Sequence, residues 1–148
     1  EKGETAAKQP AWSREGKAWG DNNDVGDTYI EVDMGAQHMW AYKAGALLID
    51  TDVVTGNISR NYGTPSMVAA IQYKDRNAVL RGDNYATPVK YWMPFYGNYG
   101  IHDASWRREF GGTVYLTNGS HGCVNTPPAA MKVIFENMDS GTPVVLYY

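Results

Sequence analysis

The chain has 148 residues, 43% hydrophobic and 20% charged, which is an ordinary composition for one globular domain. Its net charge is −3 without a cluster of lysine and arginine, which argues against nucleic-acid binding through phosphate neutralisation. No apolar run approaches the ~20 residues of a membrane span, and no signal peptide is visible at residue 1. These features fit either a cytosolic protein or a segment of a longer exported one.

Residues 1–27 are predicted to form an N-terminal tail or linker. They are polar, lack a strand period, and end in the acidic, turn-forming segment 20–27. Trp12 and Trp19 are expected to pin this tail onto the surface of the domain at 28–148. We expect the tail to connect that domain to an N-terminal partner.

Short strands separated by turn residues follow from Tyr29 onward. Alternation of apolar residues with Glu31 and Asp33, for example, indicates a half-buried strand. A turn is expected at 75–77. Such a meander predicts a mostly β fold, a sandwich or barrel of short strands. The predicted strands are 29–34, 38–42, 47–54, 67–73 and 78–80.

Segment 82–98 is rich in aromatic residues, glycine and proline. Beside a catalytic histidine, such a segment can form a lid or a wall of a substrate cleft. It can equally be a strand that packs one aromatic face in the core, which we expect in part for 91–95. Both interpretations stay open from the residues alone.

One helix is predicted near the end of the chain, because apolar residues recur there at helical spacing. Thr126 is the expected N-cap, Pro127 the first helical residue, and Gly141 the end. Residues 143–148 are then expected to form a closing strand. The apolar helical face consists of Met131, Ile134, Phe135 and Met138.

Cys123, the only cysteine, lies in Ser-His-Gly-Cys-Val-Asn at 120–125. A lone cysteine is often a small buried hydrophobe, but polar and small neighbours favour a reactive thiol here. A nucleophilic thiol needs a nearby base and backbone N–H groups aimed at the oxyanion of acyl transfer. Gly122 permits a tight turn that could aim such groups, and His102 lies upstream as a candidate base.

His102, a spacer of 17 residues and Ser-His-Gly-Cys-Val-Asn resemble the signature of the L,D-transpeptidase (YkuD) family. Trp106, four residues after His102, and Thr-Pro-Pro at 126–128 before the helix extend the likeness. It covers about residues 28–148. The resemblance implies a YkuD-like β-sandwich or barrel with one helix packed on it, and an enzyme that needs no cofactor.

The resemblance also implies the roles of the catalytic residues. Cys123 is the nucleophile, and His102 is the general base that forms a thiolate–imidazolium pair with it. The backbone carbonyl of Asp103 orients the imidazole, with a weaker contribution from its carboxylate. His121 and Gly122 support the oxyanion turn, although a purely structural role for His121 stays open.

Five further residues are predicted to bind substrate, each with a structural alternative. Ser120 is expected to hydrogen-bond locally, and Asn125 to lock the cysteine loop through its side chain. Trp106 and Tyr99 either flank the substrate channel or pack beneath it. The predicted substrate-binding residues are Ser120, Asn125, Trp106, Tyr91 and Tyr99.

The remaining polar candidates are expected to be structural. Arg107 and Arg108 are interpreted as a solvated surface pair rather than as partners of a substrate carboxylate. His38 is expected on a sheet surface beside Trp40. One cysteine and three histidines could bind zinc in principle, but paired ligand spacing is lacking, so no metal site is predicted.

The function implied by the resemblance is peptidoglycan transpeptidation. Cys123 attacks the third-residue carbonyl of a donor tetrapeptide stem, D-Ala leaves, and an acceptor amine takes the thioester to form a 3→3 cross-link. With water as acceptor the enzyme is an L,D-carboxypeptidase, and without catalysis the domain is a wall-binding module. A papain- or NlpC-type peptidase is disfavoured, because those enzymes usually place cysteine before histidine.

The same resemblance implies partners and a location. The partners are donor and acceptor stem peptides, and β-lactams of the carbapenem type are the expected inhibitors. We expect a monomer on the extracellular face of the bacterial cell envelope, anchored in the membrane or secreted as part of the full-length protein. Its role would be in cell wall biogenesis and cell shape.

Overall fold

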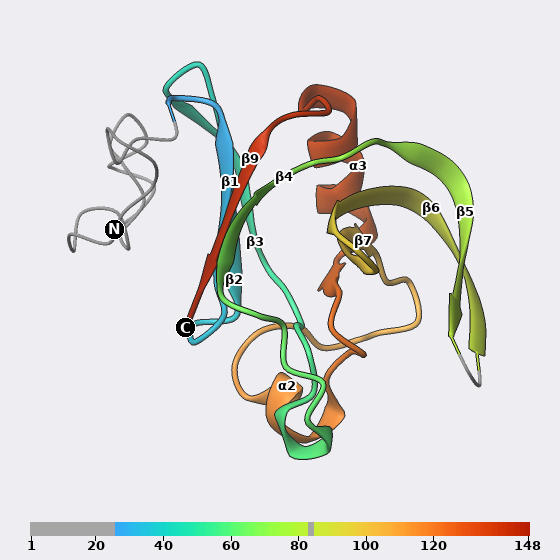
Figure 1. The fold of residues 1–148 in the computed structure, drawn as a ribbon. Coiled ribbons are helices and arrows are strands. Elements are labelled where there is room, and N and C mark those ends of the chain that lie inside the picture. Colours follow the sequence, from blue (N-terminus) through green and yellow to red (C-terminus); the bar gives the residue numbers. More distant parts are fainter. Residues whose placement is uncertain (1–25, 83–84) are drawn as a thin grey trace.

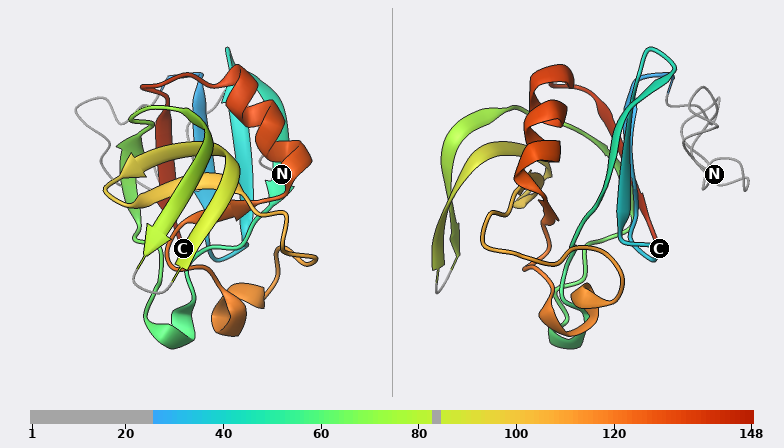
Figure 2. Two further views of the ribbon diagram at one scale, coloured as in Figure 1. Left: turned by 90° about the vertical axis from the view of Figure 1, so that its right-hand side faces the viewer. Right: turned by 180° about the vertical axis from the view of Figure 1, so that it is seen from behind.

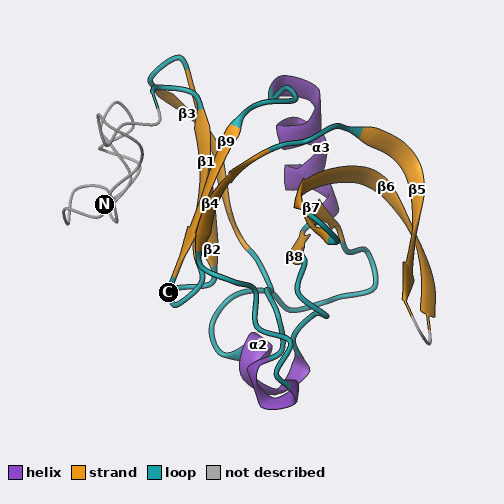
Figure 3. Cartoon of the chain, viewed as in Figure 1, coloured by secondary structure: helices purple, strands orange, loops and turns teal. Residues whose placement is uncertain are grey.

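The computed structural model describes residues 26–82 and 85–148, which form two β-sheets with one main helix (Figures 1 and 3). The mostly β fold with one packed helix that the sequence predicts is therefore confirmed. The tail expected at 1–27, including Trp12 and Trp19, lies outside the described residues except for its last two positions. In the described part of the chain, no helix is long and apolar enough to cross a lipid bilayer.

The first sheet has five strands in the order β3-β2-β1-β9-β4. β1, β2 and β3 form an antiparallel meander, whereas β9 lies parallel to β1 and antiparallel to β4. Segments from both ends of the described chain therefore lie side by side in this sheet (Figure 1). The strands are β1 Tyr29–Asp33, β2 His38–Lys43, β3 Ala46–Asp52, β4 Met67–Ala70 and β9 Pro143–Tyr147.

The second sheet has four strands in the order β5-β6-β7-β8. β5 and β6 form a long antiparallel hairpin, which curls away from the five-stranded sheet (Figure 2). β7 and β8 pair in parallel, so the chain between them crosses over before it returns to the sheet. The strands are β5 Asp75–Gly82, β6 Tyr85–Tyr96, β7 Tyr99–Asp103 and β8 Val124–Thr126.

The main hydrophobic core joins both sheets to helix α3, which spans Pro128–Asn137. α3 lies between the five-stranded sheet and the β5–β6 hairpin (Figure 2). The apolar helical face predicted from the sequence is confirmed, because its four residues all belong to this core. Two short helices, η2 Ile58–Arg60 and α2 Val114–Asn118, contact each other at the opposite end of the molecule (Figure 1).

The strand predictions for the first sheet are confirmed, with shifts at the ends. The strand expected at 67–73 is shorter and ends at Ala70. β3 starts one residue early and ends at Asp52 rather than Val54. These boundaries depend on where pairing partners stop, which the pattern of a single strand does not contain.

The turn predicted at 75–77 is wrong, because β5 already begins at Asp75. β5 is an edge strand, where exposed polar residues are expected. Arg76 extends over the rings of Tyr91 and Phe135, with 5.6 Å and 4.9 Å from Cζ to the ring centroids. Asn77 does take a turn-like φ of 55°, but the register with β6 is the same on both sides of it.

The ends of α3 also differ from the prediction. The helix begins at Pro128, so Pro127 takes the N-cap position and Thr126 belongs to β8. It ends at Asn137, well before Gly141, which has a φ of +87° in the turn that leads to β9. Either proline of a Pro-Pro pair fits the first helical turn, and here the pairing of β8 with β7 extends through Thr126.

Candidate active site

Three strands of the second sheet place a row of polar side chains on one face. Trp92 on β6 pairs with His102 on β7, and His102 pairs with Asn125 on β8. Paired residues share a face of the sheet and successive residues alternate, so these three side chains point the same way. His102 thus lies within β7, one residue before the end of the strand. The neighbouring row belongs to the hydrophobic core and consists of Met93, Ile101 and Val124.

Cys123 immediately precedes β8 and is partly exposed. It lines a cavity of about 950 Å³ together with His102. The thiol donates a hydrogen bond to the backbone carbonyl of Asn98, with 3.4 Å between Sγ and O. The cysteine and the histidine therefore reach one cavity from two neighbouring parallel strands, as the predicted pair requires.

The turn before Cys123 needs glycine at position 122. Gly122 has a φ of +128°, in the region that residues with a Cβ avoid. A Cβ added there would lie 2.4 Å from Cε1 of Tyr99. The prediction that Gly122 permits a tight turn is confirmed by its backbone, and the Tyr99 ring closes the space beneath it.

Hydrogen bonds from two side chains fix this turn. Ser120 Oγ accepts the N–H of Gly122 at 3.0 Å and donates to the carbonyl of Cys123 at 2.6 Å. Thr64, far away in the sequence, donates to the carbonyl of Gly122 at 2.7 Å. The local hydrogen bonding expected of Ser120 is confirmed. Because Ser120 accepts the N–H of Gly122, that group is not aimed at an oxyanion in the cavity, and the expectation that other N–H groups of the turn are so aimed stays a prediction.

A segment after β3 holds the cysteine loop through its backbone. Val54 and Asn125 exchange two hydrogen bonds of 3.0 Å and 2.8 Å, and the N–H of Ser120 donates to the carbonyl of Thr55. The loop is thus locked by the backbone of Asn125 rather than by its side chain, contrary to the prediction. Within the described residues, the buried Oδ1 of Asn125 has no hydrogen-bond partner.

The imidazole of His102 is oriented by its neighbour in the chain. Nδ1 lies 2.7 Å from the backbone oxygen of Asp103, which confirms the predicted contact. Because a carbonyl only accepts hydrogen bonds, Nδ1 carries the proton and Nε2 is left to accept one. The carboxylate of Asp103 accepts the N–H groups of Lys90 and Tyr91, and its charge raises the pKa of His102 less than the carbonyl contact does, in agreement with the weaker contribution expected of it.

Burial shifts the pKa values of both catalytic candidates toward their neutral forms. Desolvation lowers the pKa of His102 below 6.5, and the Asp103 contacts offset this only in part. Desolvation raises the pKa of the Cys123 thiol to about 11, although the backbone N–H of Gly100 favours the thiolate. Burial therefore favours the neutral form of each group, and the thiolate–imidazolium pair implied by the family resemblance stays a prediction.

His121 lies on the rim of the cavity. Its ring lies between those of Tyr62 and Tyr85, with centroid distances of 4.9 Å and 4.8 Å. Tyr85 is in the β5–β6 hairpin and Tyr62 follows η2, so His121 connects two walls of the cavity. No hydrogen bond between His121 and the Gly122 turn is seen in the described part of the chain.

The predicted substrate-binding residues divide into two groups. Ser120, Asn125 and Trp106 line the cavity, with the Trp106 ring centroid 5.9 Å from that of His102. Tyr99 packs beneath Gly122, in agreement with the alternative that we left open for it. The prediction for Tyr91 is wrong, because its ring packs on Phe135 of α3, 5.0 Å between centroids, away from the cavity.

Both interpretations of segment 82–98 hold, for different parts of it. Trp92, Met93 and Phe95 are buried, as in a core strand. The part nearer the hairpin tip, including Tyr85, forms a wall of the cavity. Sequence reasoning missed Tyr62 and Tyr73 in the same cavity, because no local motif connects them to the cysteine.

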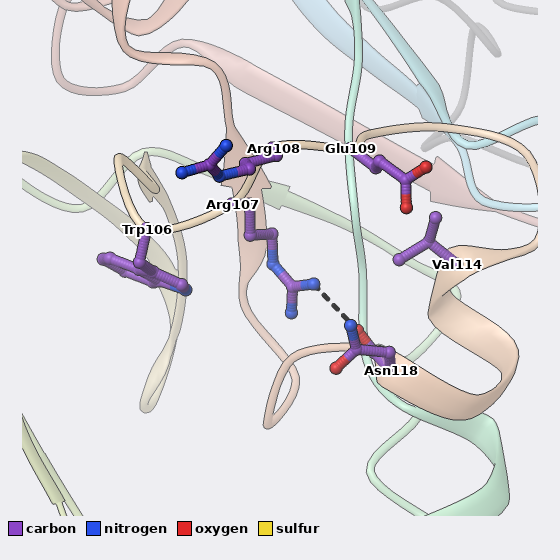
Figure 4. A pocket seen from close by; sticks show the side chains of 6 residues that line it. All are labelled: Trp106, Arg107, Arg108, Glu109, Val114 and Asn118. Atoms are coloured by element: carbon purple, nitrogen blue, oxygen red, sulfur yellow. Dashed lines mark hydrogen bonds between the residues drawn. The ribbon is translucent and has the colours of Figure 1, made fainter.

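A second cavity of about 460 Å³ adjoins the first and is shown in Figure 4. Arg107 and Trp106 line both cavities, whereas Arg108 lines only the second. Nη1 of Arg107 donates to the backbone carbonyl of Asn118 at 2.8 Å. Arg107 is half-buried and Arg108 is exposed, so the two do not form the solvated surface pair that we expected.

Outside the cavities, His38 lies on the sheet beside Trp40, as expected, with 4.6 Å between ring centroids. Its two ring nitrogens contact the carboxylates of Asp50 and Asp52, both at 2.7 Å. Among the residues that the structure describes, no group of three or more histidine, cysteine or acidic side chains is arranged to hold a metal ion.

Comparisons with known proteins agree with this arrangement. The family model for the L,D-transpeptidase catalytic domain (YkuD) matches residues 27–146. A crystal structure of an Enterococcus faecium L,D-transpeptidase with a cysteine-to-serine mutation is 43% identical, with a TM-score of 0.77. The match covers 82% of this chain and 52% of that one, so the chain spans about half the length of that enzyme.

Two further structures extend the comparison. The catalytic domain of the E. faecium L,D-transpeptidase acylated by ertapenem is 45% identical, with a TM-score of 0.73, over 81% of this chain and 96% of that one. An L,D-transpeptidase from Mycobacterium tuberculosis shares the fold at 18% identity, with a TM-score of 0.72, over 82% and 57% of the two chains. A search of the curated proteins found no match.

Proposed function

The chain belongs to the family of L,D-transpeptidase catalytic domains, and we propose on this basis that it is a peptidoglycan L,D-transpeptidase with Cys123 as its nucleophile. One observation carries the proposal. Cys123 and His102 line the same cavity, and the Asp103 carbonyl holds His102 so that Nε2 can accept a proton. The ertapenem adduct of the E. faecium domain supports the same kind of acyl chemistry here.

The first half of the proposed reaction acylates Cys123. Nε2 of His102 takes the thiol proton as Sγ attacks the carbonyl carbon of the third residue in a donor tetrapeptide stem. The N–H of Cys123 is the next donor in the turn after that of Gly122, and we expect it to stabilise the oxyanion. The C–N bond then breaks, Nε2–H protonates the leaving nitrogen, and D-Ala departs from a thioester.

The second half transfers the acyl group. An acceptor amine from a neighbouring stem loses a proton to Nε2 of His102 as its nitrogen attacks the thioester carbonyl. The C–S bond breaks, Sγ takes the proton back, and the product is a 3→3 cross-link. With water in place of the amine, the same steps give an L,D-carboxypeptidase.

The burial of both groups suits this scheme. Desolvation disfavours a charged pair before substrate arrives, so we expect the proton to move as the new bond forms. Carbapenems would acylate Cys123 by the same attack on a strained amide. We further propose that the domain acts on the outer face of the cell envelope, where its stem-peptide partners are found.

The experiment that tests this function combines two measurements on the wild type and on Cys123→Ala. Intact-protein mass after mixing with imipenem should show one adduct on the wild type and none on the variant. D-Ala release from a donor tetrapeptide should likewise require Cys123, and added acceptor amine should divert product from hydrolysis to cross-link. A wild-type protein that forms no adduct and releases no D-Ala would contradict the proposal and favour a wall-binding module.

A further inference from the structure

Arg107 lies in the wall between the active-site cavity and the smaller cavity beside it. We propose that its guanidinium binds the terminal carboxylate of the D-amino acid that leaves in acylation, and so selects donors that end one residue after the cleaved bond. This inference rests on the proposed function, because it names the part of the donor substrate that the active site recognises.

The arginine is held in place and lacks a counter-charge. Its Nη1 is fixed on the carbonyl of Asn118, and Figure 4 shows its side chain directed there while that of Arg108 points elsewhere. Nε of Arg107 is buried without a hydrogen-bond partner. No acidic side chain within the described residues forms an ion pair with Arg107. A positioned, unneutralised guanidinium matches the geometry of a carboxylate.

The acidic and basic side chains that line the active-site cavity in the described part of the chain are all basic. Arg81 and Arg107 line it, and in the described part of the chain no aspartate or glutamate does, although the net charge of the protein is −3. Desolvation also lowers the pKa of Arg107, in keeping with the lack of an ion-pair partner among the described residues. A cleft lined by one sign of charge concentrates ligands of the opposite sign, so an anionic group is expected in this cavity.

The position of Arg107 indicates which anionic group it meets. His102 protonates the leaving nitrogen, so the leaving residue must lie against His102. The carboxylate carbon of that residue is only two bonds, or about 2.5 Å, from this nitrogen. Arg107 follows Trp106, whose ring neighbours His102, and its charge acts on the His102 imidazole. Arg81 belongs instead to the β5–β6 hairpin on another wall.

The test compares two donor peptides that differ in one group. One is a tetrapeptide stem with a free C-terminal carboxylate, and the other is the same peptide with a C-terminal carboxamide. We expect the wild type to turn over the acid with a kcat/KM about 30-fold above that of the amide, typical of a hydrogen-bonded charge. Arg107→Gln should lose most of this preference by slowing only the acid, and Arg107→Lys should keep part of it.

Arg108→Gln is the matched control, because Arg108 is exposed and lines only the second cavity. It should retain the wild-type preference for the acid. Alkylation of Cys123 by iodoacetamide, a neutral reagent, should proceed in Arg107→Gln at a rate close to that of the wild type, because the charge of Arg107 has the smallest of the effects on the pKa of His102. That result would show that the thiol and its surroundings are intact in the variant.

Three outcomes would overturn the inference. The first is equal turnover of acid and amide by the wild type, and the second is equal slowing of both peptides by Arg107→Gln, which would indicate a structural role. The third is loss of the acid preference in Arg108→Gln. In each of these cases the proposed function stands, whereas a wild type that cleaves neither peptide would overturn the proposed function and this inference together.

Discussion

The floor and the hairpin wall of the active-site cavity are built in different ways. On the floor, β7 and β8 are almost wholly buried, and Ser120, Thr64 and the Asp103 carbonyl fix the turn and the imidazole. The wall is the β5–β6 hairpin, whose outer strand β5 is mostly exposed and has no strand beyond it. The chemical step needs its reacting atoms held within fractions of an ångström, whereas substrate binding by the side chains of the wall tolerates adjustment.

This comparison predicts that substitutions on the floor change the rate of the chemical step, whereas substitutions in the wall change mainly substrate binding. The largest effect is expected at the nucleophile. Cys123→Ala should lower kcat on a donor tetrapeptide by about 10⁴-fold or more, because no other thiol is present. Release of D-Ala measures this, and an unchanged melting temperature would show that the fold is retained. Residual activity within tenfold of the wild type would contradict the assignment.

The next largest effect is expected at the base. His102→Gln should lower kcat by about 10²- to 10⁴-fold, since proton transfer is lost while a polar side chain of similar size stays on β7. His121→Gln is the matched control, because His121 lies on the rim between two tyrosine rings. If His121→Gln slows the chemical step as much as His102→Gln, the two roles must be reassigned.

A third prediction concerns the rigidity of the floor. Gly122→Ala should lower the free energy of unfolding by about 3 kcal/mol, because it combines an unfavourable φ with a clash against the Tyr99 ring. Gly112→Ala also places a Cβ at positive φ, but in open space, and should cost only about 1 kcal/mol. Denaturant unfolding of both variants measures the difference. Equal losses of unfolding free energy would show that the Tyr99 ring moves aside without a cost.

A fourth prediction uses the low pKa of His102. Below pH 6.5 the unfolded chain binds a proton that the folded protein does not yet bind, because burial holds the folded pKa of His102 lower. The wild type should therefore lose stability as the pH falls from 6.5 to that folded value. His102→Gln should lack this part of the loss. Parallel curves of unfolding free energy against pH for the two proteins would contradict the shift.

The smallest effect is expected in the wall. Tyr85→Ala removes the ring that stacks on His121 at 4.8 Å, and a stacked pair contributes about 0.5–1.5 kcal/mol. We expect KM to rise by up to about tenfold while kcat changes by less than threefold. Tyr85→Phe keeps the ring and should behave as the wild type in steady-state kinetics. A large fall in kcat for Tyr85→Ala would mean that the wall takes part in the chemical step.

The sequence predicted the strands and the helix whose residues follow a regular hydrophobic pattern. The strands of the first sheet follow from alternation, and the face of α3 follows from helical spacing. The contact of His102 with the Asp103 carbonyl joins adjacent residues and was predicted from the family resemblance. The three-residue strand β8 was not predicted, because polar residues form it only through pairing with β7 and with Val54.

The errors in the site come from long-range packing. Thr64 supports Gly122 across 58 residues, and Tyr62 reaches His121 from another loop, without any local signal for either contact. Tyr91 and Tyr85 both belong to one aromatic strand, but only the structure reveals that α3 covers the first while the cavity takes the second. Arg107 was interpreted as a solvated residue because its bond to Asn118 depends on the path of the crossover.

The position of β9 between β1 and β4 has a consequence for biosynthesis. A chain emerging from the ribosome can form the β1–β2–β3 meander early, but β1 has no partner on its other side until residues 143–147 are made. Until then the pairing edges of β1 and β4 are open, and apolar residues such as Val32 lack their final neighbours. Any folding of the domain during translation therefore leaves the pairing edges of β1 and β4 open until residues 143–147 are available.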